Sequence, residues 1–142
     1  LYTFGSSNSD SRHPGYSGLI SLPNGKLYGT TFIGGASGTG TIYSFDPVTY
    51  QFNRLLDFSA INGQTPHQGV TPGPDSQLYG TTFYGGTGNA GVVYKVAPDG
   101  SNYTKLKEFN NQTQQTGVNP YGELTQLEDG SYMGTARSGG VN

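Results

Sequence analysis

Apolar and polar residues alternate along short stretches of the chain, with the period of a half-buried β-strand. In the first part of the sequence these stretches are GLISL, KLYGTTF, TIYSF and QFNRLLDF, at residues 18–22, 26–32, 41–45 and 51–58. Turn signals separate them, beginning with the Pro-Asn-Gly triplet that ends at Gly25. Because no stretch carries the period of an amphipathic helix, the pattern predicts an all-β chain of short antiparallel strands.

The same pattern recurs along the chain. LYGTTF occurs at Leu27 to Phe32 and again at Leu78 to Phe83, a shift of 51 residues. At this shift GTIYSF falls on GVVYKV, and LLDF falls on LKEF. A weaker third copy, YMGTA, follows at a shift of 54, with Met133 in the place of Tyr79 and Ala136 in the place of a threonine. The N-terminal LYTF also aligns with LLDF, so repetition covers almost the whole sequence.

Four strands in a unit of about 50 residues predict tandem four-stranded antiparallel blades of the β-propeller kind. The expected organisation is the last strand of a blade, two complete blades and a partial blade, at residues 1–4, 18–58, 69–109 and 122–142. Propellers close with about four to eight blades, so we expect that this chain alone closes no ring.

The partial blade lacks a copy of GTIY after Gly140, which predicts exposed strand edges that pair with other strands. The two ends are expected to complement each other, within one chain or head-to-tail between chains. The residues predicted to take part in this strand complementation are Leu1, Tyr2, Thr3, Phe4, Tyr132, Met133 and Gly134. The expected partners are therefore further copies of the chain or flanking repeats of a longer one.

Two long segments, NGKLYGTTFIGGASGTGTIYSFDP and DSQLYGTTFYGGTGNAGVVYKVAPDG, resemble the GloVer-type tandem repeat. Its hallmark is a Leu-Tyr-Gly-Thr-Thr core, a Gly-Gly pair and a Gly-x-[Ile/Val]-Tyr strand. The resemblance implies propeller-like blades that occur in multiples in large exported bacterial surface proteins. It also implies no characteristic enzymatic activity.

Composition narrows the expected partners. Charged residues make up 11% of the chain, the net charge is -2 and the basic residues are scattered, which argues against nucleic-acid binding. The chain has no cysteine, so it has no disulfide and no thiolate metal site. No apolar run approaches the roughly 18 residues of a membrane span. We expect no cofactor and no membrane insertion.

Candidate catalytic residues are few. His13 and His67 both lie beside a proline in the segment that leads into a blade, where the third unit has Asn119 or Tyr121. A loop role is favoured over a metal or acid–base role for both histidines. The acidic residues recur at equivalent turns and strand positions, which favours structural roles, although a paired-carboxylate glycosidase stays an alternative. We therefore predict no catalytic, metal-binding or cofactor-binding residue.

Three tyrosines that do not recur in every unit are candidate contacts for glycans or for a neighbouring subunit, namely Tyr16, Tyr84 and Tyr121. The recurring tyrosines of the second and third strands are expected in the core. Asn102 and Asn111 begin sequons and are candidate glycosylation sites. The predicted function is a non-enzymatic extracellular structural protein whose repeats self-associate into a filament, stalk or layer. The alternatives are a glycan-binding or adhesion module and, ranked below it, a polysaccharide-acting enzyme.

Overall fold

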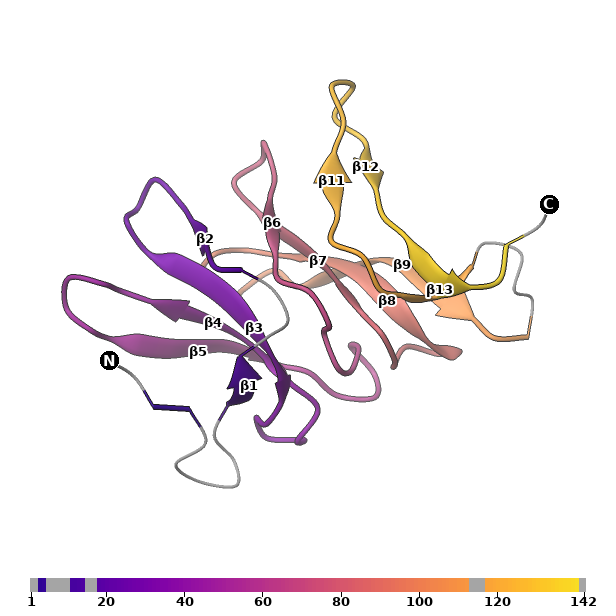
Figure 1. The fold of residues 1–142 in the computed structure, drawn as a ribbon, viewed down its shortest axis with the longest axis horizontal. Coiled ribbons are helices and arrows are strands. Elements are labelled where there is room, and N and C mark those ends of the chain that lie inside the picture. Colours follow the sequence, from indigo (N-terminus) through magenta and orange to yellow (C-terminus); the bar gives the residue numbers. More distant parts are fainter. Residues whose placement is uncertain (1–2, 5–10, 15–17, 113–116, 141–142) are drawn as a thin grey trace.

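A computed structural model describes residues 3–4, 11–14, 18–112 and 117–140. These residues form thirteen strands and no helix. Figure 1 shows the strands in three groups that follow one another along the long axis, with the two termini at opposite ends. The described strands close no ring, and the all-β, propeller-like fold predicted from the sequence is confirmed.

Blade 1 contains β2 (Ile20–Ser21), β3 (Leu27–Ile33), β4 (Thr41–Phe45) and β5 (Phe52–Asp57), which are hydrogen-bonded in sequence order. A further short strand, β1 (Arg12–Pro14), pairs with the C-terminal half of β3. All pairs are antiparallel. The third strand lies where the sequence predicted it, and β2 is shorter than the predicted stretch.

Blade 2 repeats this topology with β6 (Thr71–Pro72), β7 (Leu78–Thr82), β8 (Asn89–Val96) and β9 (Thr104–Asn110). The register repeats as well, because Gly29 pairs with Tyr43 in blade 1 and Gly80 pairs with Tyr94 in blade 2. The 51-residue repeat of the sequence is therefore a repeat of strand pairing, not only of composition.

The third blade is formed by β10 (Val118–Pro120), β11 (Thr125–Gln126), β12 (Tyr132–Met133) and β13 (Ala136–Ser138). β11 pairs with β12, and β10 pairs with β13. Together β12 and β13 occupy the place of the single strand β3, since the pair of Val118 with Ser138 repeats the pair of Arg12 with Ile33. The weak third copy is thus an interrupted second strand.

One turn chemistry joins the first two strands of every blade. The side-chain oxygen of Asn24, Asp75 or Asp129 accepts a hydrogen bond from the backbone N–H two residues later. Asn and Asp stabilise turns in this way, which explains why they stand at this position of the repeat.

The main core lies between blades 1 and 2, and both blades contribute side chains that are 0 or 1% exposed. They are Tyr28, Ile42, Phe58, Val70, Leu78, Val92, Tyr94 and Val96. Three of these come from β8, the third strand of blade 2. The predicted core positions of Tyr28, Tyr43 and Tyr94 are confirmed, whereas the prediction for Tyr79 is wrong, because this tyrosine is only half-buried.

The segments that lead into the blades correct one prediction. His13 was predicted to lie in a loop, but it belongs to β1, and in the next unit Gln64 pairs with Tyr84. We call residues 12–14, 64–66 and 118–120 the lead-in segments. Their central residues, His13, Thr65 and Asn119, have φ of 52, 52 and 56°. No glycine marks this left-handed position, so the sequence did not reveal the strand pairing.

The second and third lead-in segments also lie against the preceding blade. Thr65 N donates to Thr39 O at 2.8 Å. A Cβ on Gly40 would lie 2.7 Å from Pro66 Cδ, and the same relationship holds for Gly91 and Pro120 at 2.6 Å. Glycine is thus required at the start of the third-strand segment, because a carbonyl of the second strand and the proline of the next blade both occupy the space of a side chain, and φ is positive at Gly40 and Gly91.

Candidate functional site

The second strand of the third blade, formed by β12 and β13, is paired differently from the second strands of the other blades. β3 pairs with β2 and β4, and β7 pairs with β6 and β8. Within the described part of the chain, β12 and β13 have strand partners on one side only. Beside this edge lies a cavity of about 230 Å³, lined by Thr81, Val93, Phe109, Pro120, Leu124, Tyr132, Gly134, Thr135 and Ala136. We call this region the open edge.

The lining of this cavity matches the closed interface between blades 1 and 2. Thr81, Val93, Phe109 and Leu124 occupy the positions of Thr30, Ile42, Phe58 and Val70 in the repeat. These four counterparts are 0 or 1% exposed. In the closed interface Val92, Tyr94 and Val96 of β8 complete the packing. The cavity therefore lies where the side chains of a third strand would pack.

At the N-terminal end of the array, Phe4 packs on blade 1 in the way that Phe58 packs on blade 2. The ring centroids of Phe4 and Tyr43 are 5.3 Å apart, as are those of Phe58 and Tyr94. Tyr43 and Tyr94 are equivalent, so Phe4 packs on blade 1 as Phe58 packs on blade 2. Among the predicted complementation residues, Thr3 is exposed and Phe4 half-buried, while Leu1 and Tyr2 lie outside the described residues. Tyr132 is half-buried, and Met133 and Gly134 are exposed.

An aromatic cleft of about 620 Å³ adjoins the cavity of the open edge and shares Thr135 and Ala136 with it. It is lined by Phe32, His67, Phe83, Tyr84, Tyr121, Thr135, Ala136 and Arg137, which come from all three blades or from the segments that lead into them. The centroid of the His67 ring is 4.8 Å from those of Phe32, Phe83 and Tyr121. Arg137 Cζ lies 5.7 Å from the centroid of Phe83.

The cleft is built from two recurring positions of the repeat. Phe32, Phe83 and Arg137 correspond to one another near the end of the second strand. His67 and Tyr121 correspond to one another directly after the lead-in prolines. Stacking of the blades places the His67 ring between those of Phe32 and Phe83, and the Tyr121 ring next to His67 and Phe83, which produces the row of rings. Burial and, to a smaller extent, the charge of Arg137 lower the pKa of His67, so its imidazole is neutral near pH 7.

The family model of the Gloeobacter/Verrucomicrobia repeat matches residues 1–142. The chain belongs to this repeat family. A search of the curated proteins and a search of the solved structures each found no match. The resemblance inferred from LYGTTF and its flanking motifs is therefore confirmed, and both candidate surfaces are features of the Gloeobacter/Verrucomicrobia repeat as it stacks in this chain.

Two of the three tyrosines predicted as glycan contacts meet in the aromatic cleft of this Gloeobacter/Verrucomicrobia repeat. Tyr84 is 44% exposed and Tyr121 is 47% exposed. Tyr16 lies outside the described residues. The prediction missed Phe32, Phe83 and Arg137, although the recurring phenylalanine at the end of LYGTTF was a visible signal.

The histidines do not form a pair. Strand register places His13 at the position of Thr65 and Asn119, so Tyr121 is the counterpart of His67. His13 is exposed in β1, whereas His67 lies within the aromatic cleft. Across the described ranges of the repeat array, no three His, Cys, Asp or Glu residues come together in a group that could hold a metal ion.

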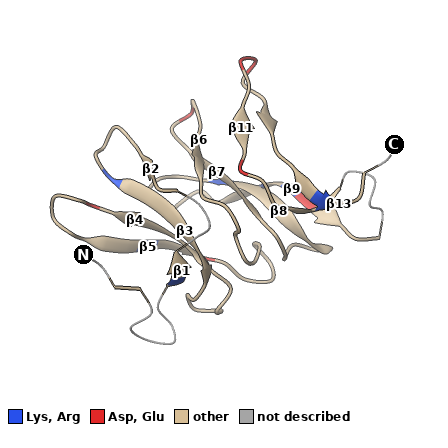
Figure 2. Cartoon of the chain, viewed as in Figure 1, with Lys and Arg blue, Asp and Glu red and all other residues tan. Residues whose placement is uncertain are grey.

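The described carboxylates of the repeat take part in turns and local pairs. Backbone N–H groups of Thr49 and Val48 donate to Asp46 and lower its pKa. Asp75 accepts from Tyr79 Oη at 2.9 Å, and with burial this hydrogen bond raises the pKa of the tyrosine to about 12. Lys105 and Thr87 donate to Glu108 and lower its pKa to about 2. Figure 2 shows that charged residues are dispersed over the repeat array, not gathered on one face.

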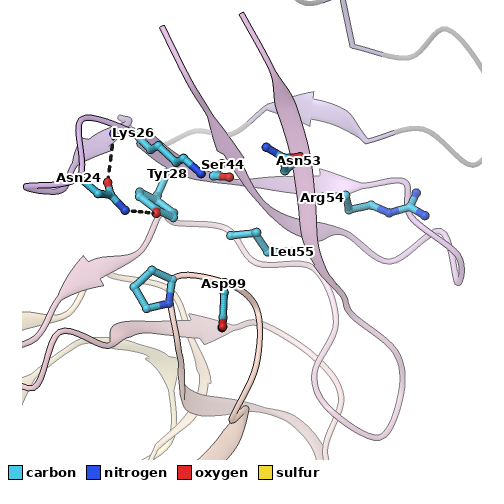
Figure 3. A pocket seen from close by; sticks show the side chains of 9 residues that line it. Asn24, Lys26, Tyr28, Ser44, Asn53, Arg54, Leu55 and Asp99 are labelled. Carbon is cyan, nitrogen blue, oxygen red and sulfur yellow. Dashed lines mark hydrogen bonds between the residues drawn. The ribbon is translucent and has the colours of Figure 1, made fainter. Parts of the chain in front are cut away.

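A third hollow, of about 490 Å³, is polar and lies between blade 1 and the β8–β9 turn (Figure 3). On one side, Asn24 Nδ2 donates to Tyr28 Oη at 2.8 Å. On the other, Asp99 accepts from the backbone and hydroxyl of Ser101 in its own turn. A Cβ on Gly100 would lie 2.3 Å from Leu55 O, so the turn is packed directly on β5. We assign this hollow to the joint between two repeat units.

The two sequons lie on exposed turns of the second repeat unit. Asn102 is exposed in the β8–β9 turn, and Asn111 is exposed directly after β9. Glycosylation of either residue stays a prediction. No helix long and apolar enough to cross a bilayer occurs in the described parts of the array.

Proposed function

We propose that this chain is a non-enzymatic structural repeat protein whose blades associate end to end through the open edge of the third blade. One observation carries the proposal, namely the cavity beside β12 and β13, whose lining repeats that of a closed blade interface. The association would build a filament, stalk or layer at the cell surface or outside the cell.

The occupant that fits the open edge is a third strand of the same repeat. The described third strands β4 and β8 are each paired on both sides. The occupant would therefore come from flanking repeats of a longer chain, or from a second copy that exchanges its third strand. In the closed interface this strand has the form Gly-x-Val-Tyr-x-Val at Gly91 to Val96, and its Val92, Tyr94 and Val96 side chains are completely buried. A strand added at β12 and β13 would form backbone hydrogen bonds with the edge, and its alternate side chains would fill the cavity. No charged contact is needed, in keeping with the low charge of the chain.

The surroundings of the polar side chains also support a structural role over catalysis. Asp46, Asp99 and Asp129 stabilise the turns in which they lie. Glu108 forms an ion pair with Lys105 of the same strand, β9. The neutral imidazole of His67 packs among aromatic rings. Catalytic acids and bases instead need a shared substrate site with matched geometry.

Sedimentation velocity over a concentration series, with electron microscopy of the same samples, tests end-to-end association. We expect oligomers that grow with concentration. Phe109→Glu places a charge in the cavity and should shift the protein to monomers, because burial of an unpaired carboxylate opposes docking. Leu106→Glu is the matched control, since Leu106 lies on the same strand and is 48% exposed. A wild-type protein that stays monomeric at every concentration contradicts the proposal.

A synthetic peptide with the sequence AGVVYKVA, residues 90–97, tests the occupant directly. It should dissociate oligomers of the wild type and of the Leu106→Glu control, and it should not bind the Phe109→Glu protein. A peptide in which the residues corresponding to Val92, Tyr94 and Val96 are serine should leave both oligomers intact. If the first peptide binds but the wild-type chain does not self-associate, the third strand belongs to the same polypeptide and association between copies is wrong.

A further inference from the structure

The end-to-end association proposed above does not account for most residues of the aromatic cleft. The cleft shares Thr135 and Ala136 with the open-edge cavity, and its six other lining residues take no part in that cavity. Its volume of about 620 Å³ is in the range of small-molecule sites, which are mostly apolar with a few placed polar groups. We propose that the aromatic cleft binds a carbohydrate that carries carboxylate groups, a polymer or oligomer of uronic acids.

The two exposed tyrosines supply the stacking surfaces. The face of an aromatic ring is electron-rich, and the C–H bonds on the flat face of a pyranose are its complement. The rings of Tyr84 and Tyr121 are supported from behind, since Phe83 lies 4.6 Å from Tyr84 and His67 lies 4.8 Å from Tyr121. The supported rings lose little conformational freedom when a ligand binds, which favours recognition of a weakly apolar ligand.

The charge of the lining selects a carboxylate. Arg137 is the charged residue of the cleft, and no Asp or Glu is among the lining residues. Its guanidinium lies over the face of Phe83, with the planar group exposed to solvent. A planar guanidinium binds a carboxylate with two parallel hydrogen bonds, whereas a neutral sugar leaves this cation without a matched acceptor.

Neutral polar groups complete the site. Thr135 lines the cleft next to Arg137 in the sequence, and its carbonyl accepts from Tyr121 N at 2.9 Å. This bond fixes Tyr121 to the strand that carries the cation. The residue that stacks on the sugar ring, Tyr121, and the residue that binds its carboxylate, Arg137, would therefore be held together by a backbone hydrogen bond.

The test is binding by isothermal titration calorimetry with oligogalacturonate, oligomannuronate and hyaluronan oligosaccharides. The carboxyl-reduced form of each is the neutral control. We expect at least one acidic oligosaccharide to bind about tenfold or more tightly than its reduced form, with affinity that falls as salt is added. Arg137→Met should remove this preference, and Tyr84→Ala and Tyr121→Ala should weaken binding by a similar factor.

Tyr50→Ala is the matched control, because Tyr50 is 68% exposed and lies outside the cleft; it should leave binding unchanged. Equal binding of acidic and reduced oligosaccharides, or no binding by any acidic member, overturns the proposal. It is also overturned if Tyr121→Ala lowers the oligomeric state and leaves glycan binding intact, since the cleft would then be a contact between copies.

Discussion

The ring of Tyr94 lies over Gly80, its partner across the β7–β8 pair, so closely that a Cβ on Gly80 would be 2.4 Å from Tyr94 Oη. Blade 1 repeats the relationship with Gly29 and Tyr43 at 2.7 Å. The glycine of LYGTTF and the tyrosine of the Gly-x-[Ile/Val]-Tyr strand are therefore two halves of one packing contact.

Gly80→Ala should lower the free energy of unfolding by about 1 to 3 kcal/mol, because the new methyl group displaces a fully buried tyrosine. Urea unfolding followed by circular dichroism measures the change. Gly18→Ala is the matched control, since no atom lies within 4 Å of a Cβ at that position. Equal stability of the two variants would show that the tyrosine moves aside without cost.

Thr30→Val should destabilise the contact between blades 1 and 2. Thr30 Oγ1 donates to Gln68 O at 2.9 Å, and the threonine is 1% exposed. Removal of the hydroxyl leaves the carbonyl without this donor, at a cost of about 1 to 2 kcal/mol. Thermal and urea unfolding measure the loss, with the exposed Thr125→Val as control. A loss no larger than that of the control would contradict a role for this bond between blades.

Glu108→Gln should lower stability near neutral pH and have no effect in strong acid. Hydrogen bonds from Lys105 and Thr87 lower the folded-state pKa of Glu108 from 4.5 to about 2. The carboxylate therefore stabilises the fold above about pH 4.5, and this contribution is lost as the pH falls towards about 2. The side chain is 29% exposed, so we expect a difference below about 1 kcal/mol.

Urea midpoints of wild type and Glu108→Gln at a series of pH values give this difference. Glu128→Gln, in the exposed β11–β12 hairpin, controls for the loss of a surface carboxylate. A Glu108→Gln deficit that is the same at acid and neutral pH would place the effect in packing, not in charge.

His67→Phe should remove an acid sensitivity of the fold. Burial, with the charge of Arg137, lowers the folded-state pKa of His67 below its ordinary 6.5. Below about pH 6.5 the unfolded chain binds a proton that the folded chain does not, so the free energy of unfolding falls. The free energy of unfolding of His67→Phe relative to wild type should therefore increase as the pH is lowered from about 7.5 to about 5. A constant difference over this range would contradict the pKa assignment.

Strand identity and the main turns could be predicted from sequence because they depend on local patterns. Alternation placed Thr41–Phe45 as a third strand, and the structure has the same bounds. The lead-in strands could not be predicted, because the left-handed conformation of Thr65 is held by contacts with another blade. Its backbone bonds reach Thr39 and Phe83, residues far away in sequence.

The candidate surfaces were only partly predictable. Tyr84 and Tyr121 stand out individually, since neither recurs in every unit. Their meeting with Phe32 and His67 depends on how consecutive blades stack, which no local pattern specifies.

The lead-in segments make each blade depend on its neighbour for folding. Thr65 N bonds to the glycine-rich loop of blade 1, and Thr65 O accepts from Phe83 N of blade 2. A single residue thus belongs to the hydrogen-bonding of two units, and pulling the blades apart also disrupts the pairing inside one of them. Such nearest-neighbour coupling makes unfolding of the array cooperative. In a tandem chain under tension, the barrier to unfolding one blade is therefore linked to the barriers of its neighbours.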